Sequence, residues 1–209
     1  MPYTNNSIEL LGRILGDPVY SHSVLGEAFF LLPFGVRRLS GTEDRLNLTV
    51  SERLLGVSPA QIGSKCRVSG QIRSYNRRTE SGSRLVITVF AQEFEEFPED
   101  PGADEELPER NEADITGFIC KPPVYRTTPF SREITDVLIA VNRRFHKSDY
   151  LPAIAWGRNA RFLAGLPVGT NLHIVGRLQS REYTKVLEDG TESVRTAFEI
   201  SCSAVEPLY

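Results

Sequence analysis

The chain consists mostly of short runs in which apolar and polar residues alternate, the pattern of β-strands with one buried face. Two longer runs are partly alternating and partly continuous, which is typical of strands buried on both faces of a small barrel. These runs are EAFFLLPFGVRRL at 27–39 and EITDVLIAVNRRF at 133–145. Each half holds one helical candidate, SERLLGVSPAQIG at 51–63 and GRNARFLAGLPVG at 157–169. The pattern therefore predicts an all-β protein with a short helix in each half.

The two halves of the sequence repeat one another. ELLGRILGDPVYS at 9–21 aligns with DITGFICKPPVYR at 114–126, and the same offset places Arg38 over Arg143. After the insertion of one residue in the second half, GQIRS at 70–74 aligns with GRLQS at 176–180. Identities that hold one register over such a distance indicate an ancient duplication of one domain.

Each copy has the element order of the OB-fold, a five-stranded Greek-key barrel, with three strands, a short helix and two further strands. We predict two tandem OB-fold domains, domain 1 at 1–93 and domain 2 at 113–209, joined by an acidic linker at 94–112. Residues 93–114 hold 11 acidic residues and one basic residue, Arg110. The net charge of −3 therefore conceals two mildly basic domains on either side of an acidic segment.

The composition also argues against several classes of protein. No apolar run approaches the roughly 18 residues of a membrane span, and a secretory signal is absent from MPYTNNSIELLGR. We therefore expect a cytoplasmic, nucleoid-associated protein. Cys66, Cys120 and Cys202 are widely spaced, and we expect them to be small buried hydrophobes. Neither zinc-site spacing nor a catalytic motif is present, so we expect no metal, no cofactor, no membrane partner and no enzymatic activity.

One segment places aromatic rings among cations. AVNRRFHKSDYLPAIAWGR at 140–158 contains Phe145, Tyr150 and the single tryptophan, Trp156, beside arginines and a lysine. Such neighbours are costly to bury, so the segment favours rings and cations that lie on an exposed surface. The alternative for Phe145 and Trp156 is a place in the core, because apolar Ile154 shares a strand face with Trp156.

Residues 113–206 resemble the bacterial single-stranded DNA-binding protein family. The matching pieces are ITGFICKPPVYRTTP, LIAVNRRF, YLPAIAWGRNARFLAG, VGRLQSREY and a closing strand that ends in AVEP. The resemblance implies a protein that coats single-stranded DNA without sequence preference in replication, recombination or repair. It implies base stacking on Phe145, Tyr150, Trp156 and Tyr183. It also implies nearby phosphate contacts from Arg143, Arg144, Arg158, Arg177, Arg181 and Lys185.

Copy one departs from this pattern. At the four stacking positions it has Ser40, Arg45, Ser51 and Arg77. Cations remain on or near the same strands, and the possible weaker DNA contacts of this copy are Arg38, Arg45, Arg53, Arg73 and Arg77. Because arginine stacks on bases as well as pairing with phosphate, copy one either binds DNA weakly or has become structural.

The family resemblance also bears on partners. Family members usually pool four OB domains, which implies a homodimer of this chain, and they recruit replication or repair proteins through an acidic C-terminal tail. The chain ends at SAVEPLY, so the linker, with Phe94 and Phe97, is either a substitute for that tail or a spacer. The alternative function is an OB-fold protein-interaction accessory of a primosome or mobile-element replication apparatus. RNA binding through the same rings is a third possibility.

Overall fold

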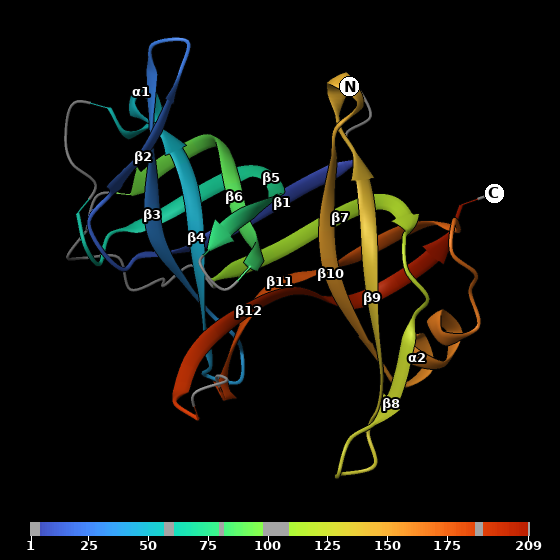
Figure 1. Ribbon diagram of the computed structural model, residues 1–209. Coiled ribbons are helices and arrows are strands. Elements are labelled where there is room, and N and C mark those ends of the chain that lie inside the picture. The colour runs from blue at the N-terminus through green and yellow to red at the C-terminus, as the bar shows by residue number, and fades with distance from the viewer. Residues whose placement is uncertain (1–4, 57–60, 80–81, 98–108, 187–189, 209) are drawn as a thin grey trace.

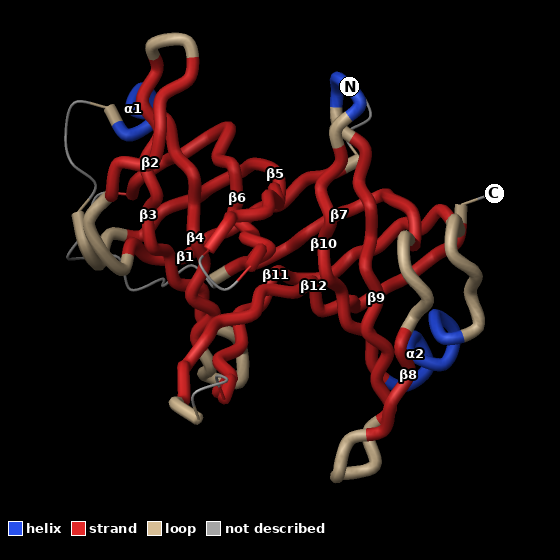
Figure 2. Tube along the Cα trace, in the orientation of Figure 1, coloured by secondary structure: helices blue, strands red, loops and turns tan. Residues whose placement is uncertain are grey.

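The computed structural model describes residues 5–56, 61–79, 82–97, 109–186 and 190–208. Strands predominate in these ranges and the helical segments are short (Figure 2). Copy one contains β1 (Asn6–Ile14), β2 (Val19–Val24), β3 (Glu27–Arg37), β4 (Glu43–Ser51), α1 (Glu52–Leu55), β5 (Lys65–Thr79) and β6 (Gly82–Phe97). Copy two contains β7 (Arg110–Ile119), β8 (Val124–Thr127), β9 (Glu133–Asn142), the 3₁₀ turn η1 (Arg144–His146), β10 (Ser148–Trp156), α2 (Gly157–Ala164), β11 (Asn171–Val186) and β12 (Glu192–Pro207).

Each copy closes into a five-stranded barrel, and the two barrels lie side by side in Figure 1. In copy one the strands pair in the order β1–β3–β4–β6–β5 and return to β1, with β4 and β6 parallel. In copy two the order is β7–β9–β10–β12–β11 and back to β7, with β10 and β12 parallel. The short strands β2 and β8 extend β3 and β9 outside the barrels. The prediction of an all-β chain with two OB-folds is confirmed, although the pattern gave no sign of β2 and β8.

Inward-facing apolar residues fill the two barrels. Those of copy one include Leu32, Phe34, Leu48, Ile72 and Val89, and those of copy two include Ile115, Ile139, Leu151, Ile174 and Ile200. They occupy alternate positions of their strands, which explains why the alternation in the sequence located the strands correctly. Burial of these side chains is the main favourable contribution to the stability of each barrel.

Gly12 and Gly117 mark the point where each barrel closes. A Cβ on Gly12 would lie 2.1 Å from the carbonyl oxygen of Gly35, and one on Gly117 would lie 2.6 Å from that of Ala140. No side chain fits so close to a backbone oxygen, so both positions require glycine. At Gly12, β1 changes its pairing partner from β5 to β3. At Gly117, β7 changes its pairing partner from β11 to β9. The repeat has glycine at both positions for this reason.

The two barrels are joined through β1 and β7, which pair in antiparallel fashion. The register places Ile8 opposite Ala113, its own counterpart in the repeat, and places Asn6 opposite Ile115 and Leu10 opposite Asn111. The pairing is therefore symmetric about Ile8 and Ala113, as in an isologous dimer. One continuous sheet of 12 strands runs through both barrels.

Strand pairing continues into the segment expected to be an acidic linker. Residues 94–97 are the last residues of β6, and residues 110–112 are the first of β7. Cross-strand pairs stabilise the end of β6: Arg67 lies over the ring of Phe97 and also binds Glu95 at 3.5 Å, and Ser69 Oγ donates to Glu93 at 2.8 Å. The middle of the segment, residues 98–108, lies outside the described residues, so the linker and its boundaries stay a prediction.

The cysteines are free, and Cys66 and Cys202 are buried as predicted, while Cys120 is half-buried. Burial raises the pKa of the Cys66 and Cys202 thiols to about 12, and it raises the pKa of Cys120 to a smaller extent. Because only the thiolate reacts with alkylating reagents, we expect iodoacetamide at pH 8 to leave Cys66 and Cys202 of the native protein unmodified. Mass spectrometry checks this, with the unfolded chain, which should react at all three positions, as the control.

Candidate nucleic-acid interface

The four aromatic side chains expected to stack on bases are all exposed. The exposed fraction is 89% for Phe145, 44% for Tyr150, 41% for Trp156 and 38% for Tyr183. Phe145 lies in η1 with a φ of 63°, in the turn between β9 and β10. The alternative of a core position for Phe145 and Trp156 is excluded, because the interior faces of β10 are occupied by neighbours such as Leu151 and Ala155.

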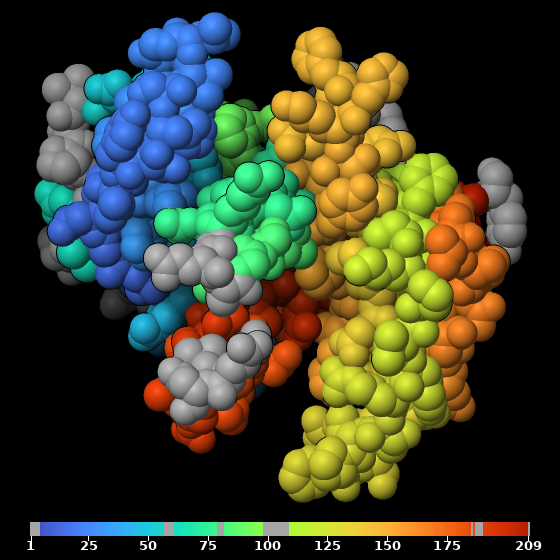
Figure 3. Space-filling view, in the orientation of Figure 1, coloured from blue at the N-terminus to red at the C-terminus, as the bar shows by residue number. Residues whose placement is uncertain are grey.

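A groove rich in arginine runs between the two barrels, with a volume of about 1340 Å³. Figure 3 shows this side of the molecule, where a hollow separates the β11–β12 hairpin from β8. We call it the arginine groove, and its positively charged and aromatic lining residues are Arg38, Arg45, Arg126, Arg132, Trp156, Arg177, Arg181 and Phe198. The groove combines predicted residues of both copies on one surface, which the sequence did not indicate.

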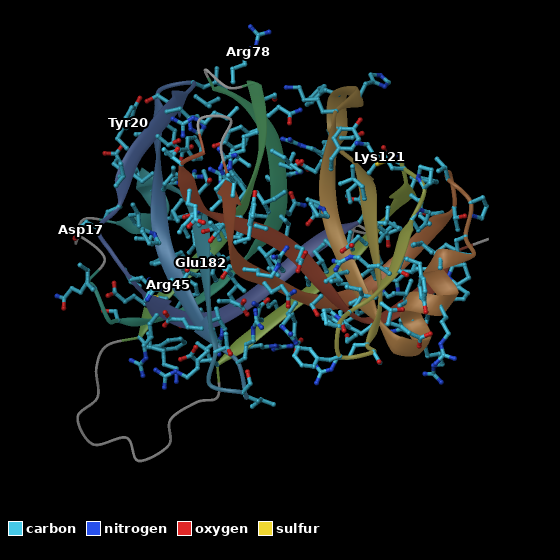
Figure 4. The ribbon with its side chains drawn as sticks, turned by 60° about the horizontal axis from the view of Figure 1, so that its bottom comes forward. Asp17, Tyr20, Arg45, Arg78, Lys121 and Glu182 are labelled. Atoms are coloured by element: carbon cyan, nitrogen blue, oxygen red, sulfur yellow. The ribbon has the colours of Figure 1, made fainter. Side chains whose placement is uncertain are left out.

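Acidic residues in the groove and beside it partly neutralise its cations. Arg126 binds Asp136 at 2.7 Å, and Arg45 binds Glu43 at 3.1 Å. Figure 4, which looks at the molecule with its underside brought forward, shows Arg45 of β4 close to Glu182 of β11. These ion pairs are exposed to solvent, so each contributes little stability and can exchange for a phosphate.

Arg181 and Tyr183 form a cation–aromatic pair next to the groove. The guanidinium of Arg181 lies over the Tyr183 ring, 5.8 Å from its centroid. The two residues are two positions apart on β11 and so share one face of that strand. In this arrangement a base can stack on the Tyr183 ring while its phosphate binds the guanidinium of Arg181.

Three arginines expected to contact DNA, Arg38, Arg73 and Arg143, bind buried carboxylates at the junction of the barrels. Asp149, fully buried on β10, accepts a hydrogen bond from the backbone N–H of Ser74 in the other barrel at 2.7 Å. The same carboxylate binds Arg143 at 3.4 Å and Arg73 at 3.0 Å. We call Asp149, Arg143, Arg73 and Ser74 the Asp149 clamp.

The second carboxylate of the junction is the repeat counterpart of the first. Asp44, buried on β4, accepts from the backbone N–H of Ser180 at 2.9 Å and binds Arg38 through its side chain at 2.5 Å. We call Asp44, Arg38 and Ser180 the Asp44 clamp. The counterpart of Arg73 in copy two is Gln179, which donates instead to Glu199 at 2.8 Å. The two clamps hold each barrel against the other, and they bind the guanidinium groups of Arg38, Arg73 and Arg143 at the same time.

The remaining predicted residues are spread over both barrels. Arg144 is exposed in η1 beside Phe145, and Arg158 is exposed at the start of α2. Arg77 is exposed near the end of β5, whereas Arg53 lies at the far end of barrel one, 3.7 Å from Glu27. The side chain of Lys185 lies outside the described residues. The roles of all these residues stay predictions.

Sequence reasoning missed three exposed residues that are candidates for contact with a ligand, two in the arginine groove and one outside it. Arg126 and Arg132 line the arginine groove, and Tyr75 is exposed on β5. The signal for Tyr75 was present, because Arg73, Tyr75 and Arg77 alternate in the run GQIRSYNRR. Nothing local marked Arg126 and Arg132, since their role depends on the approach of the other barrel.

The structure also bears on metal binding and on membrane insertion. Across the part of the chain that it describes, no group of three or more His, Cys, Asp or Glu side chains could hold a metal ion. Within the same ranges, none of the helices has the length and apolar character needed to cross a membrane.

Comparison with known proteins assigns the family. The model of the single-strand binding protein family matches residues 110–208. The "Single-stranded DNA-binding protein 2" of Streptococcus agalactiae serotype V is 30% identical over 102 residues, covering 43% of this chain and 76% of that protein. The chain belongs to the single-strand binding protein family. The resemblance seen in the sequence of copy two is thereby confirmed.

The likeness of fold extends over both copies of this family member. A deletion variant of the single-stranded DNA binding protein from Thermus aquaticus has a TM-score of 0.74 and 18% identity, covering 98% of this chain and 94% of that one. The wild-type protein of the same species has a TM-score of 0.72 and 18% identity, covering 98% and 93%. At this identity the likeness concerns the fold, and it includes copy one, which lies outside the match of the family model.

Proposed function

We propose that this member of the single-strand binding protein family binds single-stranded DNA without sequence preference, in replication, recombination or repair. The observation that carries the proposal is the shared surface of Trp156, Arg181 and the other cations of the arginine groove. Aromatic faces accept any base and arginines follow the phosphates, so such a surface gives affinity without reading sequence. The proposal assigns no catalytic step to the protein.

The geometry of the groove supports binding of a flexible single strand rather than a duplex. Its lining comes from both barrels, and Trp156 is exposed within it. Stacking on such rings requires unpaired bases, which a duplex does not offer. Phe145, Tyr150 and Tyr183 extend the proposed path beyond the groove, with Arg144, Arg158 and Arg177 as phosphate contacts.

Salt dependence tests the electrostatic part of the proposal. Five arginines of the groove are not held by a buried carboxylate, namely Arg45, Arg126, Arg132, Arg177 and Arg181. If each neutralises one phosphate, the slope of log affinity against log salt should be about −3.5, from about −0.7 per contact on a single strand. Fluorescence anisotropy with a labelled dT oligonucleotide at several salt concentrations measures the slope.

The matching duplex and an RNA strand of the same length are the controls. The duplex should bind much more weakly, and equal affinity for duplex and single strand would contradict the proposal. Competition between DNA and RNA decides which single strand is preferred. The masses of the free and bound protein in the same titration test the further proposal that two chains associate to give four OB domains.

A further inference from the structure

The two faces of the barrel junction carry different chemistry at equivalent positions. On the face of the arginine groove, β4 meets β11, and the backbone N–H of Arg45 donates to Ser180 Oγ at 2.8 Å. At the second contact between the barrels, β10 meets β5, and the backbone N–H of Tyr150 donates to Ser74 Oγ at 2.6 Å. The repeat relates these two contacts to one another. Arg45 on one face therefore stands where Tyr150 stands on the other.

The same exchange occurs at the neighbouring strand. Arg181 follows Ser180 on β11 and lines the arginine groove, whereas Tyr75 follows Ser74 on β5. Tyr75 has an exposed fraction of 47%, close to that of Tyr150. Two arginines on one face are thus matched by two tyrosines on the other. We call the second surface the tyrosine face, made of Tyr75, Tyr150 and Arg77.

The charges at the junction increase this difference. On the tyrosine face, the Asp149 clamp binds two guanidinium groups, those of Arg73 and Arg143, and Arg73 also donates to Gln71. At the arginine groove, Asp44 binds one guanidinium group among the described residues, that of Arg38. A guanidinium that is bound to a buried carboxylate is partly neutralised, so it attracts a phosphate less strongly. The tyrosine face therefore has two tyrosines beside one exposed arginine, Arg77, whereas the arginine groove has five arginines that no buried carboxylate in the described ranges binds, beside Trp156 and Phe198.

We propose that one DNA strand is held by base stacking on the tyrosine face and mainly by phosphate contacts in the arginine groove, and that Tyr75 is a stacking residue supplied by copy one. The inference rests on the proposed function and adds to it. Copy one, which has lost the rings at the positions expected from the repeat, contributes an aromatic contact at a different place. Tyr75 and Tyr150 lie on adjoining strands of different barrels, so a strand on this face bridges the junction.

Salt dependence distinguishes the two kinds of contact. For Tyr75→Ala we expect dT affinity to fall about 5- to 140-fold at every salt concentration, with the salt slope unchanged, because stacking releases no counterions. For Arg45→Ala we expect a loss that shrinks as salt rises, with the slope reduced in magnitude by about 0.7. Tyr75→Phe keeps the ring and should bind within about twofold of the wild type.

The matched control is Tyr20→Ala, which removes a tyrosine of β2 that is 58% exposed and lies away from both faces; its dT affinity should equal that of the wild type. A readout on the unmodified protein avoids any folding defect. Photocrosslinking to an oligonucleotide that contains 5-iodouracil should attach to Tyr75, as mapped by mass spectrometry.

Two outcomes separate this inference from the proposed function. If Tyr75→Ala binds like the wild type and Tyr75 forms no crosslink while Trp156→Ala weakens binding, the role of Tyr75 is overturned and the proposed function stands. If the wild-type protein does not prefer single-stranded DNA to duplex, the proposed function fails. A change of salt slope in Tyr75→Ala would likewise overturn the assignment of stacking to this face.

Discussion

Replacing Asp149 with alanine should lower the free energy of unfolding by about 3 kcal/mol, near the lower end of the range for breaking a buried ion pair. The side chain is fully buried and holds three donors, the N–H of Ser74 and the guanidinium groups of Arg73 and Arg143. Removal leaves the Ser74 N–H without its acceptor. The two arginines are partly exposed and can regain water, which keeps the expected loss from being larger. Urea denaturation followed by circular dichroism measures the change.

Two variants provide the comparison for this prediction. Asp136→Ala removes an exposed carboxylate that binds Arg126, and it should cost less than about 1 kcal/mol. Asp44→Ala should destabilise the protein less than Asp149→Ala, because the Asp44 clamp holds one arginine rather than two. An Asp149→Ala protein as stable as Asp136→Ala would show that the clamps do not hold the barrels together.

The second large effect is expected on binding. The triple variant Tyr150→Ala, Trp156→Ala, Tyr183→Ala should lose affinity for a dT oligonucleotide by about 100-fold or more. The estimate sums the loss of three stacked bases, each taken at the low end of about 1–3 kcal/mol. That range is a general value for OB-folds that bind single strands. The rings are exposed and leave the barrel interior intact. Anisotropy titration at constant salt gives the affinity.

The matching variant with three phenylalanines keeps flat rings at all three positions and should retain most of the affinity. Thermal denaturation of both variants verifies that folding is preserved. A triple alanine variant that binds dT as tightly as the wild type would overturn the stacking proposal. It would favour instead a module whose main partner is another protein.

The sequence located the elements of the fold because their causes are local. Alternation marked the barrel strands, since each residue on a strand faces either the core or the outside. The repeat gave the correspondence between copies, and the pairing of β1 with β7 follows the same register. The exposed rings at Phe145, Tyr150, Trp156 and Tyr183 were also predicted, from the family resemblance and, for the first three, from the cations that flank them in the sequence. In the segment predicted to be a linker, at 94–112, pairing with β5 extends β6 as far as Phe97, which the run of acidic residues did not indicate.

Residue patterns alone thus indicated two copies of an all-β barrel, the family likeness of the second copy, and the aromatic residues that face water. Which arginines are available to a ligand depends on how the two barrels pack against each other. Arg73 and Arg143 are 70 residues apart, yet both bind Asp149, because β5 of one barrel meets β10 of the other. Local alternation reports whether a side chain points inward or outward, but it carries no information about a partner on a distant strand. The arginine groove and the clamps depend on such partners, so they became visible only when the two barrels were placed side by side.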